Sequence, residues 1–310
     1  MKKGINIMAL LVLLLAFDSN GQQDPLVTQY MFNGLYLNPA YAGSHEYWSS
    51  TFTYRNQWTG ADFNGAPETA IAAVDGPIRG HNMGLGGIFV HDQIGVTTQN
   101  AFLVNYAYQL VFNKKSKLAF GLSAGLSQYS ANLRDVLIWD EQDGVYASNT
   151  SVILPRVGFG AYYYAKKYYL GFSIPTLLAY DSTEDFNMDL SRASFLRRHY
   201  LLTGGIVIDV SKQVKFKPSI LVKYVESAPL EGDINFSAIF RDAFWIGASY
   251  RTGDALAVIL EYQTNSYFRI GYSYDITMTN LRTYSNGSHE IMIGVDFGKD
   301  LKKIKTPRYF

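Results

Sequence analysis

Residues 267–275 read YFRIGYSYD, and this stretch decides the fold of the chain. One face of the extended chain would carry Phe268, Ile270, Tyr272 and Tyr274, and the other Tyr267, Arg269, Gly271, Ser273 and Asp275. Apolar residues facing lipid and small or polar residues facing a lumen, over roughly 9–11 residues, are typical of a transmembrane barrel strand. A soluble sandwich strand also alternates, but it usually has about 5–6 residues.

The same alternation recurs along the chain, clearly in residues 117–128 and 289–297. The sequence therefore predicts an all-β fold, a transmembrane antiparallel β-barrel of about fourteen strands, and an even number is expected for a bacterial single-chain barrel. The expected strands are 48–58, 67–76, 82–92, 98–112, 117–130, 154–165, 168–176, 199–210, 213–225, 231–241, 243–252, 255–264, 266–275 and 288–297.

The composition agrees with a barrel in a membrane. The 310 residues include 24 Tyr and 19 Phe, and only 17% are charged, against about 25% in soluble proteins. Tyr has an apolar body and a polar tip, which suits a membrane interface. The chain has no Cys, so a disulfide scaffold is excluded, and its net charge of +1 gives no reason to expect a nucleic-acid partner.

The first 21 residues are interpreted as a signal peptide. Lys2 and Lys3 precede an apolar run of residues 7–17, which is too short to span a bilayer as a helix. An N-terminal buried helix is the alternative interpretation. Cleavage after Gly21 would remove Lys2, Lys3 and Asp18 and leave a mature chain with no net charge.

Residues 22–47 are predicted to form a helical plug and an elbow ahead of the barrel, which occupies residues 48–297. Asp24 is a favourable N-cap and Pro25 a favourable first helical residue, while Asn38-Pro39 would end the helix. Apolar residues lie on all sides of this helix, so we expect it to be buried, plugging or capping the periplasmic mouth. The candidate plug residues are Tyr30, Met31, Phe32, Leu35, Tyr36, Asn38 and Pro39.

The connections between the predicted strands suggest an orientation. Links after even-numbered strands are short, as expected of periplasmic turns, whereas 131–153, 177–198 and 276–287 are long, as expected of outer loops. The links near 226–230 and 253–254 are short and do not follow this alternation. Both termini would then be periplasmic. The tail, residues 298–310, is a solvated segment or a docking peptide for a periplasmic partner; the residues available for docking are Lys302, Lys303, Lys305, Arg308, Tyr309 and Phe310.

No arrangement of residues predicts catalysis, a metal site or a cofactor. The five histidines have no metal-ligand spacing, and the tetrapeptide GSHE, found at 43–46 and 287–290, would lie at opposite ends of the barrel. The acidic groups in loops 131–153 and 177–198 match no calcium-loop spacing, so we interpret them as solvated. Gly84, Gly86 and Gly87 are interpreted as thinning the lumen face of a strand or letting it bend.

Several short motifs, in order along the chain, resemble the PorP/SprF family of type IX secretion system outer-membrane proteins. They are Gln29-Tyr-Met-Phe-Asn33, Asn38-Pro-Ala-Tyr-Ala-Gly-Ser44, Tyr54-Arg55, Gln57-Trp58, Gly65-Ala-Pro67, Asp75-Gly-Pro77, Asp92-x-Ile-Gly95, Ser288-His-Glu290 and Pro307-Arg-Tyr-Phe310. The resemblance implies a barrel in the outer membrane of a Gram-negative, Bacteroidota-type bacterium. It also implies a role in secreting or anchoring cargo with C-terminal sorting domains, such as large adhesins used in gliding, and an association with periplasmic ring proteins.

The resulting hypothesis is a non-enzymatic outer-membrane platform for type IX secretion, surrounded by outer-membrane lipid and bound to a secreted partner. The alternative is an outer-membrane channel for a small or hydrophobic solute. A lipid hydrolase is a third class, but it would need a Ser, a His and an acid or amide on one wall, which the sequence does not bring together.

Overall fold

The computed structural model describes residues 25–60, 65–113, 116–133, 149–178, 198–225, 228–264 and 267–298. Predictions for the signal peptide, for the tail residues from Lys302 to Phe310 and for most of the two long loops concern residues outside these ranges. Among the described residues, no helix has the length and hydropathy needed to cross a bilayer.

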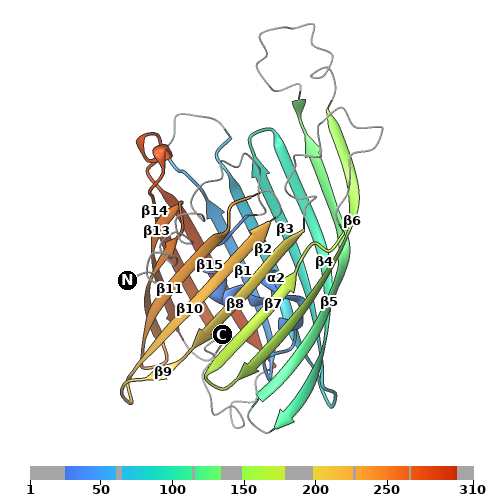
Figure 1. Ribbon diagram of the computed structural model, residues 1–310, viewed down its shortest axis with the longest axis vertical. Helices are drawn as coiled ribbons and strands as arrows, with labels where there is room; N and C mark the ends of the chain where they lie inside the picture. The colour runs from blue at the N-terminus through green and yellow to red at the C-terminus, as the bar shows by residue number, and fades with distance from the viewer. Residues whose placement is uncertain are drawn as a thin grey trace, which may run out of the picture.

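The wall of the molecule is a closed antiparallel barrel (Figure 1). The strands are β1 Trp48–Asn56, β2 Glu68–Ile78, β3 Met83–Ile94, β4 Thr97–Asn113, β5 Ser116–Ala131, β6 Thr150–Ala165, β7 Tyr168–Ile174, β8 His199–Ile206, β9 Ile208–Asp209, β10 Val214–Val225, β11 Glu231–Phe240, β12 Phe244–Arg251, β13 Ala255–Gln263, β14 Phe268–Thr277 and β15 Ser288–Phe297. A short 3₁₀ turn, η7 (Asn280–Thr283), follows β14.

The barrel closes where its first and last strands meet. β1 pairs with β2 on one side and with β15 on the other, from Trp48 opposite Phe297 to Asn56 opposite His289. β8 and β9 both pair with β10 and are separated only by Val207, so together they make one strand of the wall. The wall therefore has fourteen strands, as predicted, and a closed wall leaves no open sheet edge in the membrane.

The outward face of the wall is apolar. Phe102, Leu122, Leu126, Ile234 and Phe236 each expose more than half of their surface, whereas the polar residues that alternate with such positions are buried inside the barrel. An exposed apolar band of this extent is stable only against lipid. The period-two pattern in the sequence thus gives both the strands and the direction in which each side chain points.

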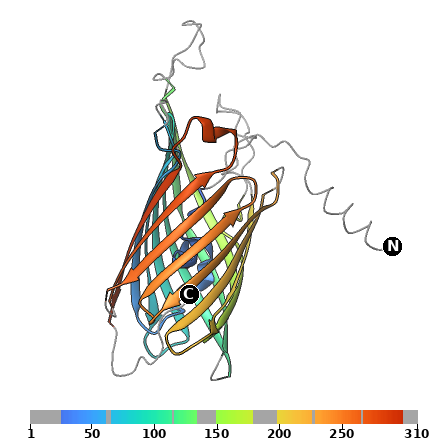
Figure 2. The same cartoon turned by 90° about the vertical axis from the view of Figure 1, so that its left-hand side faces the viewer.

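The N-terminal segment crosses the inside of the barrel (Figures 1 and 2). It contains three short turns, which are η1 (Tyr30–Phe32), α2 (Gly34–Leu37) and η2 (Pro39–Tyr41). The prediction of one continuous helix over residues 25–37 is wrong, because residues 25–29 are not helical and Asn33 interrupts the rest. The local preference of Pro25 for a helix start is overridden by contacts with the lumen wall. A regular helix would not make these contacts.

Candidate functional site: the N-terminal strap in the lumen

Residues 25–44, here called the strap, run through the lumen from one end of β1 toward the other. Near its start, the hydroxyl of Thr28 lies beside Arg55, next to the last residue of β1. Near its end, the amide of Gly43 donates to Asp75 of β2, which faces the first residues of β1. The strap therefore occupies the depth of the lumen, and whether it plugs or caps the periplasmic mouth stays a prediction.

The start of the strap, at Thr28 and Gln29, is held by a buried charge cluster. Arg55 reaches Asp275 at 2.7 Å and Glu290 at 3.3 Å. The backbone amides of Thr28 and Gln29 each donate to one oxygen of Glu290 at 2.8 Å. Glu290 is fully buried, so its charge depends on these donors and on Arg55.

A second arginine extends this cluster along the wall. Arg251 of β12 contacts Asp233 at 3.2 Å and Asp254 at 3.3 Å, and it also donates to the Thr28 hydroxyl at 3.4 Å. Thr28 donates in turn to Asp275. One small strap residue thus links two arginines and a carboxylate from three different strands.

An aromatic group holds the middle of the strap. The ring of Phe32 meets Trp245 of β12 edge to face, with centroids 5.2 Å apart. The ammonium of Lys217, which is completely buried, lies 5.2 Å from the Trp245 ring, 5.8 Å from Phe32 and 5.9 Å from Tyr169. Cation–π attraction in such a desolvated place is worth on the order of 2 kcal/mol. Lys217 therefore binds strap and wall together.

Tyr30 faces the same part of the wall. Its hydroxyl donates to Ser219 of β10 at 3.3 Å. Burial raises the pKa of Tyr30 well above its ordinary value, because water no longer solvates the phenolate. The phenol therefore remains a neutral hydrogen-bonding group.

Asn38 ties the lower half of the strap to two strands. Its Nδ2 donates to the carbonyl oxygens of Ala161 in β6, at 3.0 Å, and of Phe172 in β7, at 3.2 Å. Its Oδ1 accepts from the Ala40 amide at 2.9 Å and caps η2, whose first residue is Pro39. The Asn38 side chain thus pairs hydrogen-bonding groups of both the strap and the wall.

Glycines in the wall make room for the backbone of the strap. A Cβ on Gly121 of β5 would collide with Ala40, and one on Gly84 of β3 would collide with Ala42. A Cβ on Gly160 of β6 would strike the Asn38 side chain. The small size of these glycines allows the strap to lie against the strands, and Gly84 is one of those interpreted from the sequence as thinning the lumen face.

The lower end of the strap is a tight turn. Gly43 has φ +66°, a left-handed conformation that glycine adopts without strain. Its carbonyl accepts from Gln109 of β4 at 2.5 Å, and the Gln109 oxygen accepts from Lys117 at 3.1 Å. Tyr41 packs edge to face on Tyr162 of β6, with centroids 5.5 Å apart. The chain then turns into β1.

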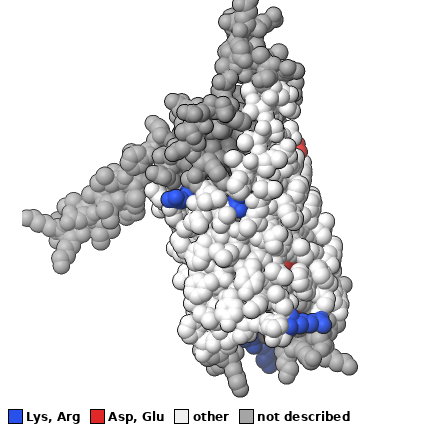
Figure 3. All heavy atoms as spheres, turned by 90° about the vertical axis from the view of Figure 1, so that its right-hand side faces the viewer, with Lys and Arg blue, Asp and Glu red and all other residues white. Residues whose placement is uncertain are grey.

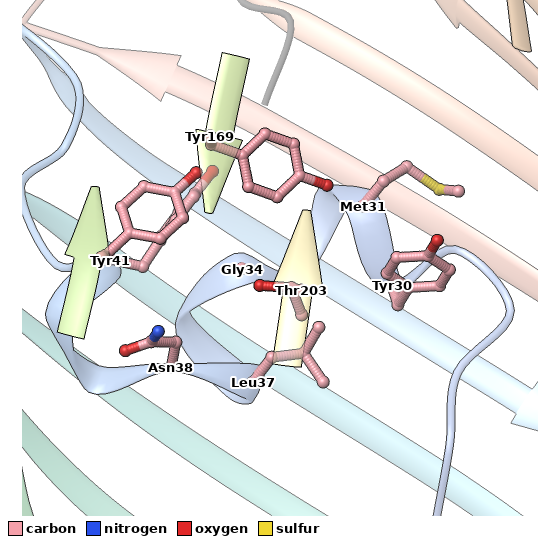
Figure 4. A pocket seen from close by; sticks show the side chains of 9 residues that line it. Tyr30, Met31, Gly34, Leu37, Asn38, Tyr41, Tyr169 and Thr203 are labelled. Atoms are coloured by element: carbon pink, nitrogen blue, oxygen red, sulfur yellow. The ribbon is translucent and has the colours of Figure 1, made fainter. Parts of the chain in front are cut away.

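A narrow pocket remains between the strap and strands β6, β7 and β8 (Figure 4). It has space for about one water molecule. Its lining residues are Tyr30, Met31, Gly34, Leu37, Asn38, Tyr41, Tyr162, Tyr169 and Thr203. In Figure 4 the phenol rings of Tyr30, Tyr41 and Tyr169 surround the turns of the strap. So small a pocket leaves no room there for a solute.

All seven candidate plug residues lie in the strap. Tyr30, Met31, Phe32, Leu35, Asn38 and Pro39 are buried, and half-buried Tyr36 donates to the Pro25 carbonyl at 2.9 Å. Their role as a plug stays a prediction. Five further residues of the site were not predicted, although each is a charged residue on the lumen face of a predicted strand. They are Arg55, Lys217, Arg251, Asp275 and Glu290.

Three of the motifs noted in the sequence come together in space. Gln29 from the first motif, Arg55 from another and Glu290 from Ser288-His-Glu290 meet in the charge cluster. A family model described as "Type IX secretion system membrane protein PorP/SprF" matches residues 19–295. The chain belongs to the PorP/SprF family. As a PorP/SprF protein with a closed barrel, it is an outer-membrane component of type IX secretion.

No curated protein matches the chain. Similar solved structures include a KdgM porin (11% identity, 80% of this chain and 99% of the other, TM-score 0.38) and Omp33 of Acinetobacter baumannii (7% identity, 81% and 98%, TM-score 0.49). A FadL homologue from Pseudomonas aeruginosa is another (11% identity, 90% and 95%, TM-score 0.46). Similarities this low carry no argument about the function of the PorP/SprF protein.

Proposed function

We propose that the protein is a non-enzymatic, closed platform that assists type IX secretion or surface anchoring of exported proteins with C-terminal sorting domains. Large adhesins, including those used in gliding, are the expected cargo. Membership of the PorP/SprF family supports the secretion role. The partners are such a cargo protein and the periplasmic ring of the machine.

The proposal that the lumen is closed to solutes rests on the strap. It contacts β1, β6, β7, β10 and β12 through the bonds and ring contacts described above, so it reaches opposite sides of the lumen. A channel for a small or hydrophobic solute would need a continuous path past these contacts. The strap's contacts across the lumen therefore favour a surface for proteins over the channel alternative.

The proposed orientation places the short turns in the periplasm. β2 and β3, β6 and β7, and β11 and β12 are joined by two to four residues at one rim. At the other rim, 57–67, 132–149, 175–198 and 278–287 are longer, whereas 95–96, 226–230 and 252–254 are also short. Long outer loops would meet the cargo outside the cell, while the tail, residues 298–310, would meet the ring.

The test combines a conductance measurement with a secretion assay. The purified protein in a planar bilayer should show no steady current, and a deletion strain should lose one or more exported proteins from its surface. Re-expression of the intact chain should restore them. Large steady currents from the intact protein would contradict a closed platform, and unchanged surface proteins in the deletion strain would contradict the secretion role.

A chain lacking residues 25–38 provides the matching comparison. If the strap closes the lumen, this variant conducts or its barrel loses stability. A variant that stays folded, silent in the bilayer and active in secretion would show that the strap is not a plug. The heat-dependent shift of the folded barrel on a gel separates loss of folding from loss of closure.

A further inference from the structure

Basic side chains mark the rim of short turns. Arg79 lies between β2 and β3, Lys166 and Lys167 between β6 and β7, Lys212 between β9 and β10, and Arg241 between β11 and β12. All five side chains are exposed. Figure 3 shows a group of basic side chains near the lower end of the barrel, below a wall with few charges. Three of these turns follow one another in the sheet order, and the β2–β3 turn with Arg79 is separated from them by β4 and β5, so the cations extend along the rim from β2 to β12.

Most of these cations are available to a partner. Lys167 bonds to Asp209 at 2.5 Å. In contrast, Arg79, Lys166, Lys212 and Arg241 form no salt bridge with any other residue that the structure describes. The rim therefore presents more positive charge than its own carboxylates neutralise.

Three of the four turns also adjoin the apolar outer face. Tyr168, Val210 and Phe240 are exposed and lie within two residues of Lys166, Lys212 and Arg241. A cation beside the last lipid-facing side chain of a strand sits at the level of the lipid headgroups. The group that cations at this level would bind is the negatively charged phosphodiester of an anionic phospholipid.

We infer that the rim of short turns binds the headgroups of anionic phospholipids through Arg79, Lys166, Lys212 and Arg241. A lipid leaflet surrounds the barrel and can reach all four turns, whereas one protein would meet them on one side. At the opposite rim, Arg198 and Arg282 are the exposed basic residues within the described ranges. The inference depends on membrane insertion but not on the secretion role.

Native mass spectrometry of the detergent-purified full chain tests the inference. The protein is mixed with phosphatidylglycerol or with phosphatidylcholine of the same acyl chains, and the retained lipids are counted. The intact chain should retain phosphatidylglycerol in preference. The combined variant R79Q/K166Q/K212Q/R241Q should lose that preference by about tenfold or more, since each cation near a lipid surface contributes about fivefold.

The variant R198Q/R282Q is the matched control, because it removes exposed arginines from the other rim. It should keep the preference of the intact chain. Equal retention of both lipids by the intact chain would overturn the inference, and so would an equal loss in both variants. Should the fourfold variant fail to fold, the salt dependence of the intact chain decides, because a headgroup contact weakens as salt rises.

Discussion

At the scale of single residues, the barrel interior contains buried charges that are stable only when they are paired. Glu290 and Asp275 both face Arg55, and all three side chains are almost completely buried. Removing one partner of such a cluster leaves an uncompensated charge away from water, which is more costly than the cluster itself is stabilising.

Arg55→Ala should therefore destabilise the barrel by about 3–5 kcal/mol. Urea unfolding in lipid vesicles, followed by tryptophan fluorescence, measures the change. Arg282→Ala removes an exposed arginine and should change stability by no more than about 0.5 kcal/mol. Equal midpoints for the two variants would show that the cluster is not needed for stability.

The wall glycines provide a second prediction at this scale. Gly121→Val would push against the backbone of Ala40 and should cost about 1–3 kcal/mol or displace the strap. At Gly87 the nearest atom to an added Cβ is 3.8 Å away, in the Val74 side chain, so Gly87→Val is the control.

The thermal midpoint of the gel shift and the bilayer current report the two outcomes for Gly121→Val. A lower midpoint indicates strain, and a current indicates displacement of the strap. If Gly121→Val behaves like Gly87→Val in both measurements, the close contact between β5 and the strap is not a constraint.

At the scale of elements, the strap is joined to the wall through hydrogen bonds that involve side chains of the strap, the wall or both. Asn33 follows η1, and its Oδ1 accepts from the hydroxyl of Thr53 in β1 at 3.1 Å. The chain contains no cysteine, so an introduced pair would have no competitor.

We expect the double variant Asn33→Cys/Thr53→Cys to form a disulfide on mild oxidation and to keep full secretion activity, because the closed platform needs no movement of the strap. The secretion assay with and without a reductant measures this, and each single cysteine variant is the control. Activity that is lost on oxidation and regained on reduction would show that the strap must move.

The strands could be predicted from the sequence and the strap could not, for a physical reason. The alternation of YFRIGYSYD reports which side of a strand meets lipid, and β14 spans Phe268–Thr277 close to the predicted 266–275. The shape of the strap depends on distant groups such as Trp245 and Gly121. Pro25 and Asn38 describe local preferences only, so they suggested one helix where the lumen imposes three short turns.

At the scale of the whole molecule, strap and barrel should open together. The amides of Thr28 and Gln29 donate to a buried carboxylate of β15, and releasing them exposes the charge cluster. Hydrogen exchange measured on peptides that cover residues 25–33 should be as slow as exchange in β1 and β15.

Exchange of these amides within seconds, while the β1 and β15 amides stay protected, would mean that the strap detaches from an intact barrel. In that case Arg55→Ala should not increase the exchange rate of the strap amides any further. If the strap and barrel are one unit, Arg55→Ala should accelerate exchange in both.

The charge cluster also could not be read from the sequence as a site, because its members are far apart along the chain. Thr28 and Glu290 are separated by 262 residues, and Arg55 and Asp275 by 220. Each of these residues can be assigned to the lumen face from its own strand, but its partners cannot be identified in that way. Only closure of the barrel shows that they meet.

The contact between Thr28 and Glu290 has a consequence for biogenesis. Thr28 is among the first residues of the strap to be synthesised, and β15 is the last strand, so the bond cannot form until the whole wall has been delivered. A chain truncated before β15 would lack the carboxylate that receives the strap, and Arg55 would lose Glu290 as a partner. The cluster thus couples completion of β15 to the final packing of the strap in the barrel interior.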